Sequence, residues 1–195
     1  MQKLNQQPDI CPYFSPEFKV IPQYIIMKEG ECMELNNRTT SFFIFILSGE
    51  ITISFEQYTN RSVLENEMFF LPKNNCFKWK AVTQTVLILT GYNATIFPCT
   101  SVRARILYKI KAGVKFDCRG VVMKDEVKVV VNQMKHYLES GINCHHMYIL
   151  KHKELYLMFK HFYTYEEIIQ IFYLILGSNP LFNERVLDNY LKVKT

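Results

Sequence analysis

The sequence is short of glycine, and its glycines are not grouped. Only seven of the 195 residues are glycine, and no two of them fall within one short loop. Loops that hold nucleotide phosphates use several glycines, because the backbone amides must approach the phosphate closely. The sequence therefore shows no sign of a nucleotide-binding loop.

Long apolar segments are lacking as well. Runs such as Phe42–Leu47 have the length of a strand, whereas a membrane-spanning helix needs about 18 consecutive apolar residues. The first ten residues, MQKLNQQPDI, hold no apolar segment of the kind found in a secretory signal. We therefore expect a cytoplasmic protein without membrane contact.

Motifs for catalysis or metal binding are missing too. The six cysteines lie far apart, with no C-x-x-C pair, which predicts buried core thiols in a reducing compartment. They are Cys11, Cys32, Cys76, Cys99, Cys118 and Cys144. Neither G-x-S-x-G nor H-E-x-x-H occurs. We expect no catalytic residue, no metal and no cofactor, and thus a protein that is not an enzyme.

All five histidines lie in the second half of the chain, without the spacing of a zinc site. They are His136, His145, His146, His152 and His161. His145 and His152 are seven residues apart and would share one face of a helix. We expect these histidines in solvent or at helix ends.

Short apolar or alternating segments dominate the first part of the chain. Ile51, Ile53 and Phe55 alternate with polar residues, as in a strand with one buried face. The predicted strands are Val20–Met27, Phe42–Leu47, Ile51–Phe55, Met68–Leu71, Cys76–Lys80 and Val86–Leu89, with a further one over Arg105–Lys111. Many short strands without helices between them predict a small antiparallel barrel or sandwich over residues 1–122.

Helical periodicity begins near Lys124. Val127, Val130, Val131, Met134, Tyr137 and Leu138 form one helical stripe, which Ser140-Gly141 should end. A second helix is predicted over Tyr148–Phe162, a third after a Thr164–Glu167 capping box and before Gly177, and a fourth from Asn183. The prediction is an α+β chain with a helical segment over residues 123–195.

Aromatic residues are frequent in the β region. They either pack the core or line a cavity for a small organic ligand, and the sequence leaves both interpretations open. The candidate pocket residues are Phe43, Phe45, Phe55, Phe77, Trp79 and Tyr92.

The stretch FILSGEITISFEQYTNRSVLENEMFFLPKNNCFKWKA, from Phe45 to Ala81, resembles the core of cupin-like sensor domains of jelly-roll type. Metal-binding cupins carry two histidines and a glutamate before a glycine that corresponds to Gly49. Those places hold Asn36, Arg38 and Phe42 here, and Asn75, Cys76 and Phe77 stand where a further histidine is expected. This departure argues against metal chemistry.

The run KHKELYLMFKHFYTYEEIIQIFYLILGSNPLFNERVLDNYLKVKT, from Lys151 to Thr195, resembles AraC-family transcriptional regulators, particularly those of gut Bacteroidetes. The resemblance implies a ligand-sensing and dimerising region whose chain stops within the first helix of a DNA-binding domain. DNA would then be bound only through a domain that follows Thr195.

The resemblance also implies a homodimer. Val127, Val131, Met134 and Leu138 are the candidate dimer face, and the alternative is that this stripe packs onto the sheet. Two other functions stay open. One is a stand-alone cupin-like protein, either a small-molecule binder or a metal-dependent enzyme, and the other is an interaction module whose barrel is filled by its own side chains.

Overall fold

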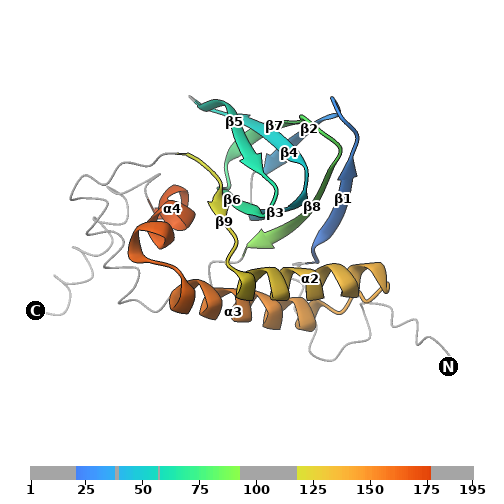
Figure 1. Ribbon diagram of the computed structural model, residues 1–195, viewed down its shortest axis with the longest axis vertical. Helices are drawn as coiled ribbons and strands as arrows, with labels where there is room; N and C mark the ends of the chain where they lie inside the picture. The colour runs from blue at the N-terminus through green and yellow to red at the C-terminus, as the bar shows by residue number, and fades with distance from the viewer. Residues whose placement is uncertain (1–20, 38–39, 57, 93–117, 177–195) are drawn as a thin grey trace, which may run out of the picture.

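A computed structural model describes residues 21–37, 40–56, 58–92 and 118–176, which form nine strands and three helices. Figure 1 shows the strands as two curved layers, with the helices on one side of them. The strands are β1 (Gln23–Met27), β2 (Cys32–Asn37), β3 (Ser41–Ser48), β4 (Glu50–Phe55), β5 (Tyr58–Leu64), β6 (Glu67–Leu71), β7 (Asn75–Ala81), β8 (Thr85–Tyr92) and β9 (Val121–Val122). The helices are α2 (Asp125–Glu139), α3 (His145–Phe162) and α4 (Tyr165–Leu176).

Strand pairing defines the fold. The first sheet has the order β1-β8-β3-β6-β9 and the second the order β2-β7-β4-β5, and the pairs between neighbouring strands are antiparallel. The strands β1 to β8 are interleaved between the sheets as in a jelly roll built from two Greek keys. The predicted α+β architecture, a jelly-roll sandwich followed by helices, is therefore confirmed.

The first sheet is buried on both of its faces, whereas the second sheet is buried on one face. Strand β3 has a continuous buried stretch at its centre, because the helices cover one face of the first sheet and the second sheet covers the other. Strands β4 and β7 instead alternate buried and more exposed residues, because one face of the second sheet meets solvent. The apolar run and the alternating segments of the sequence thus mark two-sided and one-sided burial.

Six predicted strands correspond to β1, β3, β4, β6, β7 and β8, whereas β2, β5 and the two-residue strand β9 were not predicted. Strand β9 lies at an edge of the first sheet, and β2 and β5 lie at the two edges of the second sheet. Strands β2 and β5 are largely polar, and β5 buries only Val63, so their sequences lack a strong apolar pattern. The strand predicted over Arg105–Lys111 lies outside the described residues.

The helices follow the predicted boundaries closely. Helix α2 ends before Ser140 and Gly141, where Gly141 has a φ of +71°. The capping box before α4 is confirmed: the Thr164 amide donates to Glu167 Oε2 at 2.8 Å, and the Glu167 amide donates to Thr164 Oγ1 at 3.3 Å. The helix predicted from Asn183 lies outside the described residues. In the described part of the chain, no helix has the length and apolar character that a membrane crossing requires.

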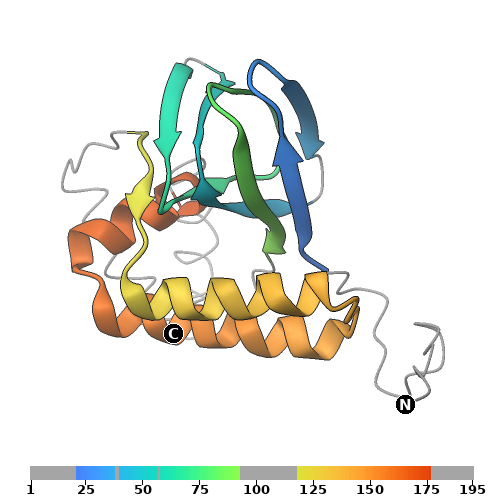
Figure 2. The ribbon, with the colours of Figure 1, turned by 45° about the vertical axis from the view of Figure 1, so that its right-hand side comes forward.

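Helices α2 and α3 lie side by side beneath the first sheet, and α4 lies near β6 and β9 (Figure 2). One hydrophobic cluster contains residues of the first sheet and of all three helices. The division expected at residue 122 therefore runs through a shared core, and as a domain boundary it stays a prediction.

The prediction of buried thiols was wrong for three of the four described cysteines. Cys32, Cys76 and Cys144 are exposed, and Cys118 is buried. Cys76 points away from the core on the alternating strand β7, and its thiol donates a hydrogen bond to Glu34 Oε1 at 3.1 Å. This carboxylate raises the pKa of the Cys76 thiol. Cys11 and Cys99 lie outside the described residues.

Candidate ligand site between the sheet and the helices

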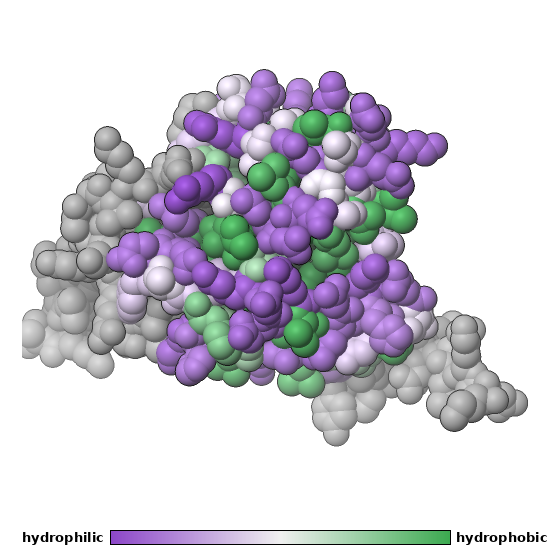
Figure 3. Space-filling model, viewed as in Figure 1, coloured by the Kyte–Doolittle hydropathy of each residue, from purple (hydrophilic) through white to green (hydrophobic). Residues whose placement is uncertain are grey.

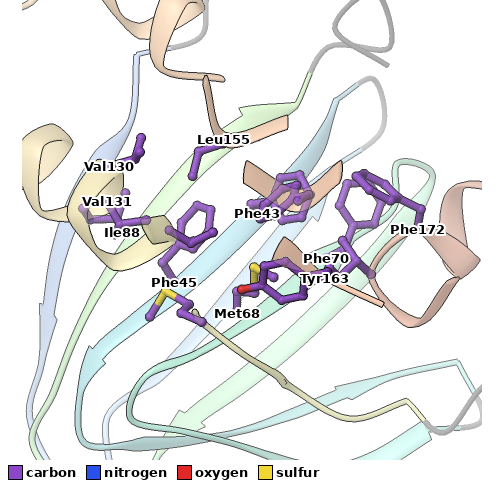
Figure 4. Packing of buried hydrophobic residues seen from close by; sticks show 14 of the residues in the cluster. Phe43, Phe45, Met68, Phe70, Ile88, Val130, Val131, Leu155, Tyr163 and Phe172 are labelled. Carbon is purple, nitrogen blue, oxygen red and sulfur yellow. The ribbon is translucent and has the colours of Figure 1, made fainter. Parts of the chain in front are cut away.

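The face of the first sheet that meets the helices is lined with aromatic side chains. Figure 4 shows Phe43, Phe45 and Phe70 from the strands packing toward side chains from the helices, including Leu155 and Phe172. The rings of Phe43 and Phe70 are 4.9 Å apart between centroids, and those of Phe43 and Phe172 are 6.1 Å apart. Such edge-to-face contacts favour one relative placement of the sheet and the helices.

The candidate dimer face on α2 contributes to this same cluster. Val127, Val131 and Met134 have no exposed surface, and Leu138 packs against the cluster as a partly buried residue. The stripe is covered by the chain itself, which is the second of the two interpretations that the sequence left open. A dimer would have to use other side chains.

A polar pair lies inside this apolar cluster. Thr90 projects from β8 on the same side as Ile88 and is fully buried, and His152 projects from α3 between Tyr148 and Leu155 with 3% of its surface exposed. A hydrogen bond joins Thr90 Oγ1 and His152 Nε2 at 2.8 Å, and which atom donates depends on the tautomer of the imidazole. The pair thus connects a strand to a helix through the core.

Burial keeps this region uncharged. Because His152 is removed from water, its pKa is lowered to about 4, and the ring is neutral near pH 7. Burial also raises the pKa of Tyr92 above its ordinary range, so its phenol stays protonated. The prediction of solvent-exposed or helix-end histidines was therefore wrong for His152. It was also wrong in part for His145, which stands at the start of α3 but is 8% exposed.

A small cavity of about 10 Å³ lies beside the polar pair. This is close to the lower limit for one water molecule. Its lining comes from the sheet and from both α3 and α4: Phe43, Tyr92, His152, Leu155, Tyr156, Phe159 and Phe172. A second cavity of about 10 Å³ is lined by Phe43 together with residues that include Phe70, Val121 and Ile171. Phe43 lines both cavities, and aromatic rings account for most of the wall of the first cavity.

The six candidate pocket residues separate into two groups. Phe43, Phe45 and Tyr92 lie on the helix side of the first sheet, and Phe43 and Tyr92 meet at the cavity with ring centroids 5.4 Å apart. The other three pack between the two sheets. They are Phe55, Phe77 and Trp79. Only the first group therefore packs against the helices.

The space between the sheets is filled by the chain's own side chains, and it contains one unusual polar atom. Trp79 is 2% exposed, and its Nε1–H group finds no acceptor in the described part of the chain. A buried donor without a partner destabilises a fold by about 1–3 kcal/mol. The unpartnered Nε1–H group of Trp79 is thus a cost to stability within an otherwise filled core.

The positions compared with cupin metal ligands do not assemble a metal site. Asn36 pairs with Cys76 between β2 and β7, Phe42 lies in β3, and Arg38 falls outside the described residues. Among the residues that the structure describes, no group of three or more His, Cys, Asp or Glu side chains could hold a metal ion.

Thr90, His152, Tyr156 and Phe172 were not predicted as site residues. The signal for His152 is present in the sequence, because it lies in phase with the apolar residues Leu155 and Phe159 on one helical stripe. A polar residue in such a stripe is expected to have a buried partner. Nothing in the sequence identifies Thr90 as that partner, since 62 residues separate the two.

No protein-family model matches the chain, and no curated protein matches it. Solved structures do show similarity. A conserved protein of unknown function from Streptococcus pyogenes has 19% identity and a TM-score of 0.34, over 37% of this chain and 62% of that protein. The cupin domain of Schizosaccharomyces pombe Cnp3 has 19% identity and a TM-score of 0.37, over 43% of this chain and 59% of that domain.

A cupin superfamily protein from Desulfitobacterium hafniense has 17% identity and a TM-score of 0.35, over 38% of this chain and 68% of that protein. The matched part thus spans less than two thirds of the first two proteins. The strand order of this chain, and not these similarities, establishes its jelly roll.

Proposed function

We propose that this chain is the ligand-sensing and dimerising region of an AraC-type transcriptional regulator in the cytoplasm. In this role, a small organic molecule binds the cupin-like part and changes the position or mobility of the helices. Those helices then influence a DNA-binding domain encoded after Thr195. The chain itself performs no reaction in this proposal.

One observation carries the proposal: a single cavity is bounded by the sheet and by the helices α3 and α4. Phe43 and Tyr92 come from the strands, His152 and Tyr156 from α3, and Phe172 from α4. Because the cavity is no larger than a water molecule, a larger ligand must displace a helix when it binds. Binding free energy is thereby linked to helix position, as a switch requires.

The chemistry of the cavity favours a small uncharged aromatic compound with a hydrogen-bonding group. The walls are mainly aromatic rings, and the polar atoms at the site belong to a neutral imidazole and to phenols. A charged ligand would lose its hydration without gaining an opposite charge. We therefore place aromatic metabolites ahead of sugars and fatty acids.

A thermal-shift screen of aromatic metabolites, sugars and fatty acids tests ligand sensing, because a ligand that binds the native state raises Tm by mass action. The shift should be lost in His152→Leu and kept in Trp79→Phe, which alters the space between the sheets. The opposite pattern would place the ligand within the sandwich. No shift with any compound would contradict the sensor proposal.

The DNA-binding part has a separate test. The reading frame that follows the codon for Thr195 should encode two helix-turn-helix units, and the longer protein should bind operator DNA with a ligand-dependent affinity. A stop codon directly after Thr195 would contradict this part of the proposal.

A second candidate is an interaction module without a ligand. It is favoured by the filled space between the sheets and by the water-sized cavities. A metal-dependent cupin enzyme is not better supported, and elemental analysis that finds stoichiometric metal in the purified protein would favour it.

A further inference from the structure

The second cavity, which lies among β6, β9 and α4, differs from the first in having a charged side chain in its wall. Arg119 and Gln170 are the polar residues in its lining, and the other lining residues are apolar. Arg119 stands before β9 and is exposed, whereas Gln170 belongs to α4 and is half-buried. The lining of the first cavity contains no Arg, Lys, Asp or Glu of the described chain. The two cavities are therefore suited to chemically different molecules.

Gly120 allows the segment before β9 to lie close against β6. A Cβ at this position would come within 2.8 Å of the Glu67 Cδ atom. The Glu67 carboxylate is held in place by the Leu64 amide, which donates to Oε2 at 2.9 Å. Gly120 is buried and leads directly into β9, which pairs with β6. Because residue 120 has no side chain, Arg119 can lie at the edge of the first sheet, beside the cavity.

We propose that the second cavity binds a small monocarboxylate with an apolar body, and that Arg119 binds its carboxylate. A guanidinium has five N–H donors, so two of them can hold a carboxylate in a bidentate pair while the others keep contacts within the chain. The Gln170 amide would donate to the same carboxylate from α4. The apolar body would pack against Phe43, Phe70 and Ile171, which line the same cavity.

The charges around the cavity favour a ligand with one negative charge. A neutral compound would displace water from the Arg119 guanidinium without supplying an opposite charge. A second carboxylate on the ligand would lie near Glu67, whose side chain rests against Gly120, and like charges at short distance repel. This selection differs from that of the first cavity, where we expect an uncharged molecule.

The mouth of this site reaches the surface near β9. Arg119 is exposed there, and Val122 is 57% exposed. In Figure 3, green and purple side chains lie next to each other over the region where Figure 1 places β6 and β9. Ligand sites typically combine apolar walls with a few polar groups that fix the orientation of the bound molecule. A compound with one charged end and an apolar body matches this combination.

A ligand larger than water can enter only if part of α4 shifts, because the enclosed volume is about 10 Å³. The first turn of α4 is tied to the start of α2 by the ion pair between Glu167 Oε1 and Lys124 Nζ at 2.9 Å. Further along α4, Ile171 and Phe172 are buried in the apolar cluster. Ile171 lines the second cavity and Phe172 the first. A ligand in either cavity would therefore move the same turn of α4.

The inference deepens the proposed function, and its regulatory meaning rests on that function. An uncharged molecule in the first cavity and a monocarboxylate in the second would act on one helix. Because each ligand changes the position of α4, each would change the affinity for the other by the same factor. Binding of the carboxylate itself needs neither DNA nor the first ligand, so it can be measured alone.

An NMR titration of the full chain with phenylacetate tests the site. Phenylacetate should bind saturably, and its neutral counterpart phenylacetamide should bind at least about tenfold more weakly, as expected for the loss of a charged hydrogen bond. The amide resonances of β9 and of α4 beyond Glu167 should shift most, whereas those of the second sheet should stay in place. Absence of saturable binding, or shifts confined to the second sheet, would overturn the proposal.

Arg119→Gln tests the residue that carries the proposal. This variant should bind phenylacetate at least about tenfold more weakly than the parent does, and Gln170→Leu should weaken binding by a smaller factor. Arg61→Gln is the matched control, because Arg61 is an exposed arginine on β5 in the second sheet, and it should bind as the parent does. Circular dichroism shows whether each variant is folded. Equal affinities of Arg119→Gln and Arg61→Gln would overturn the assignment.

Phenylmalonate, which carries a second carboxylate, tests the role of Glu67. It should bind the parent more weakly than phenylacetate does, and Glu67→Gln should reduce this difference because the like charge is removed. A difference that Glu67→Gln leaves unchanged would contradict the placement of the carboxylate beside Gly120.

The two cavities can be told apart with His152→Leu, which alters the first cavity. Phenylacetate should bind this variant as it binds the parent. Loss of phenylacetate binding in His152→Leu, with unchanged binding in Arg119→Gln, would place the carboxylate in the first cavity and overturn the proposal. If phenylacetate fails to bind while uncharged aromatic compounds still raise Tm, the second site is wrong and the sensor proposal stands.

Discussion

Thr90 and His152 form a buried hydrogen bond of 2.8 Å between β8 and α3, within a cluster of otherwise mainly apolar side chains. Apolar packing alone tolerates small shifts of a helix along a sheet, whereas a buried polar pair is satisfied in one placement only. The pair therefore specifies how α3 sits on the sheet, and it does so beside the candidate ligand cavity.

Replacing Thr90 by valine should destabilise the protein although the two side chains have nearly the same shape. His152 would keep its place but lose its partner, which costs about 1–3 kcal/mol for a buried group. Urea denaturation at pH 7 measures the change in the free energy of unfolding. The companion variant Thr90→Val/His152→Leu should lose less than the sum of the two single changes, because both members of the pair are then apolar. Strict additivity would show that the hydrogen bond contributes nothing.

The lowered pKa of His152 also predicts that the protein loses stability in mild acid. Its pKa is lowered by burial to about 4 in the folded chain, from an ordinary value of 6.5. The unfolded chain therefore binds the proton first, and stability falls as the pH drops from about 6.5 to about 4. The full effect corresponds to about 3 kcal/mol. Well above pH 6.5 both states are neutral at this residue, and it adds no pH dependence.

The matched variants for this experiment are His152→Leu and His136→Gln. The first removes this titrating group and should make the fall of the unfolding free energy between pH 6.5 and pH 4 smaller than in the parent. The second changes a histidine on the exposed side of α2 and should behave as the parent does. Equal pH profiles for the parent and His152→Leu would contradict the assignment.

The fold was predictable because apolar patterns depend on local burial. The alternating segment Ile51–Phe55, with one buried face, predicted β4. The apolar run Phe42–Leu47, with two buried faces, predicted β3. The polar edge strand β5 has one buried residue, Val63, and its place is decided by pairing with β4. Although β4 and β5 are neighbours in the chain, a strand with one buried residue has too little apolar alternation to be recognised from its own sequence.

The site was less predictable than the fold, because it depends on which face of each strand meets the helices. Aromatic content grouped Phe43 and Tyr92, which lie on the helix side of the first sheet, with Phe77 and Trp79, which face the other sheet. Adjacent residues of one strand point to opposite faces. Only the placement of the helices shows which face carries the cavity.

The capping box before α4 should contribute measurably to stability. The side chains of Thr164 and Glu167 accept hydrogen bonds from each other's backbone amides. Glu167 Oε1 also forms an ion pair with Lys124 Nζ at 2.9 Å. Thr164→Ala should lower the unfolding free energy by about 0.5–2 kcal/mol. Thr164→Ser, which keeps the hydroxyl, is the control and should lose much less. Equal losses for both variants would show that the hydroxyl does not cap α4.

Two glycines allow the cost of backbone strain to be measured apart from the cost of a steric clash. Gly49, in the turn between β3 and β4, has a φ of +85°, and Gly30, between β1 and β2, has a φ of +78°. An alanine Cβ at Gly49 would meet the Gln84 carbonyl and lie 2.9 Å from Thr85 Cα, whereas a Cβ at Gly30 would meet nothing within 4 Å. Gly30→Ala should therefore cost about 1–2 kcal/mol for the left-handed conformation alone.

Gly49→Ala should cost more than Gly30→Ala, because the added methyl group meets backbone atoms that cannot rotate away. Overpacking of this kind adds about 1–3 kcal/mol to the conformational cost. Urea denaturation of both variants at pH 7 gives the comparison directly. If the two alanine variants lost the same stability, the close approach between the β3–β4 turn and the start of β8 would not be present in solution.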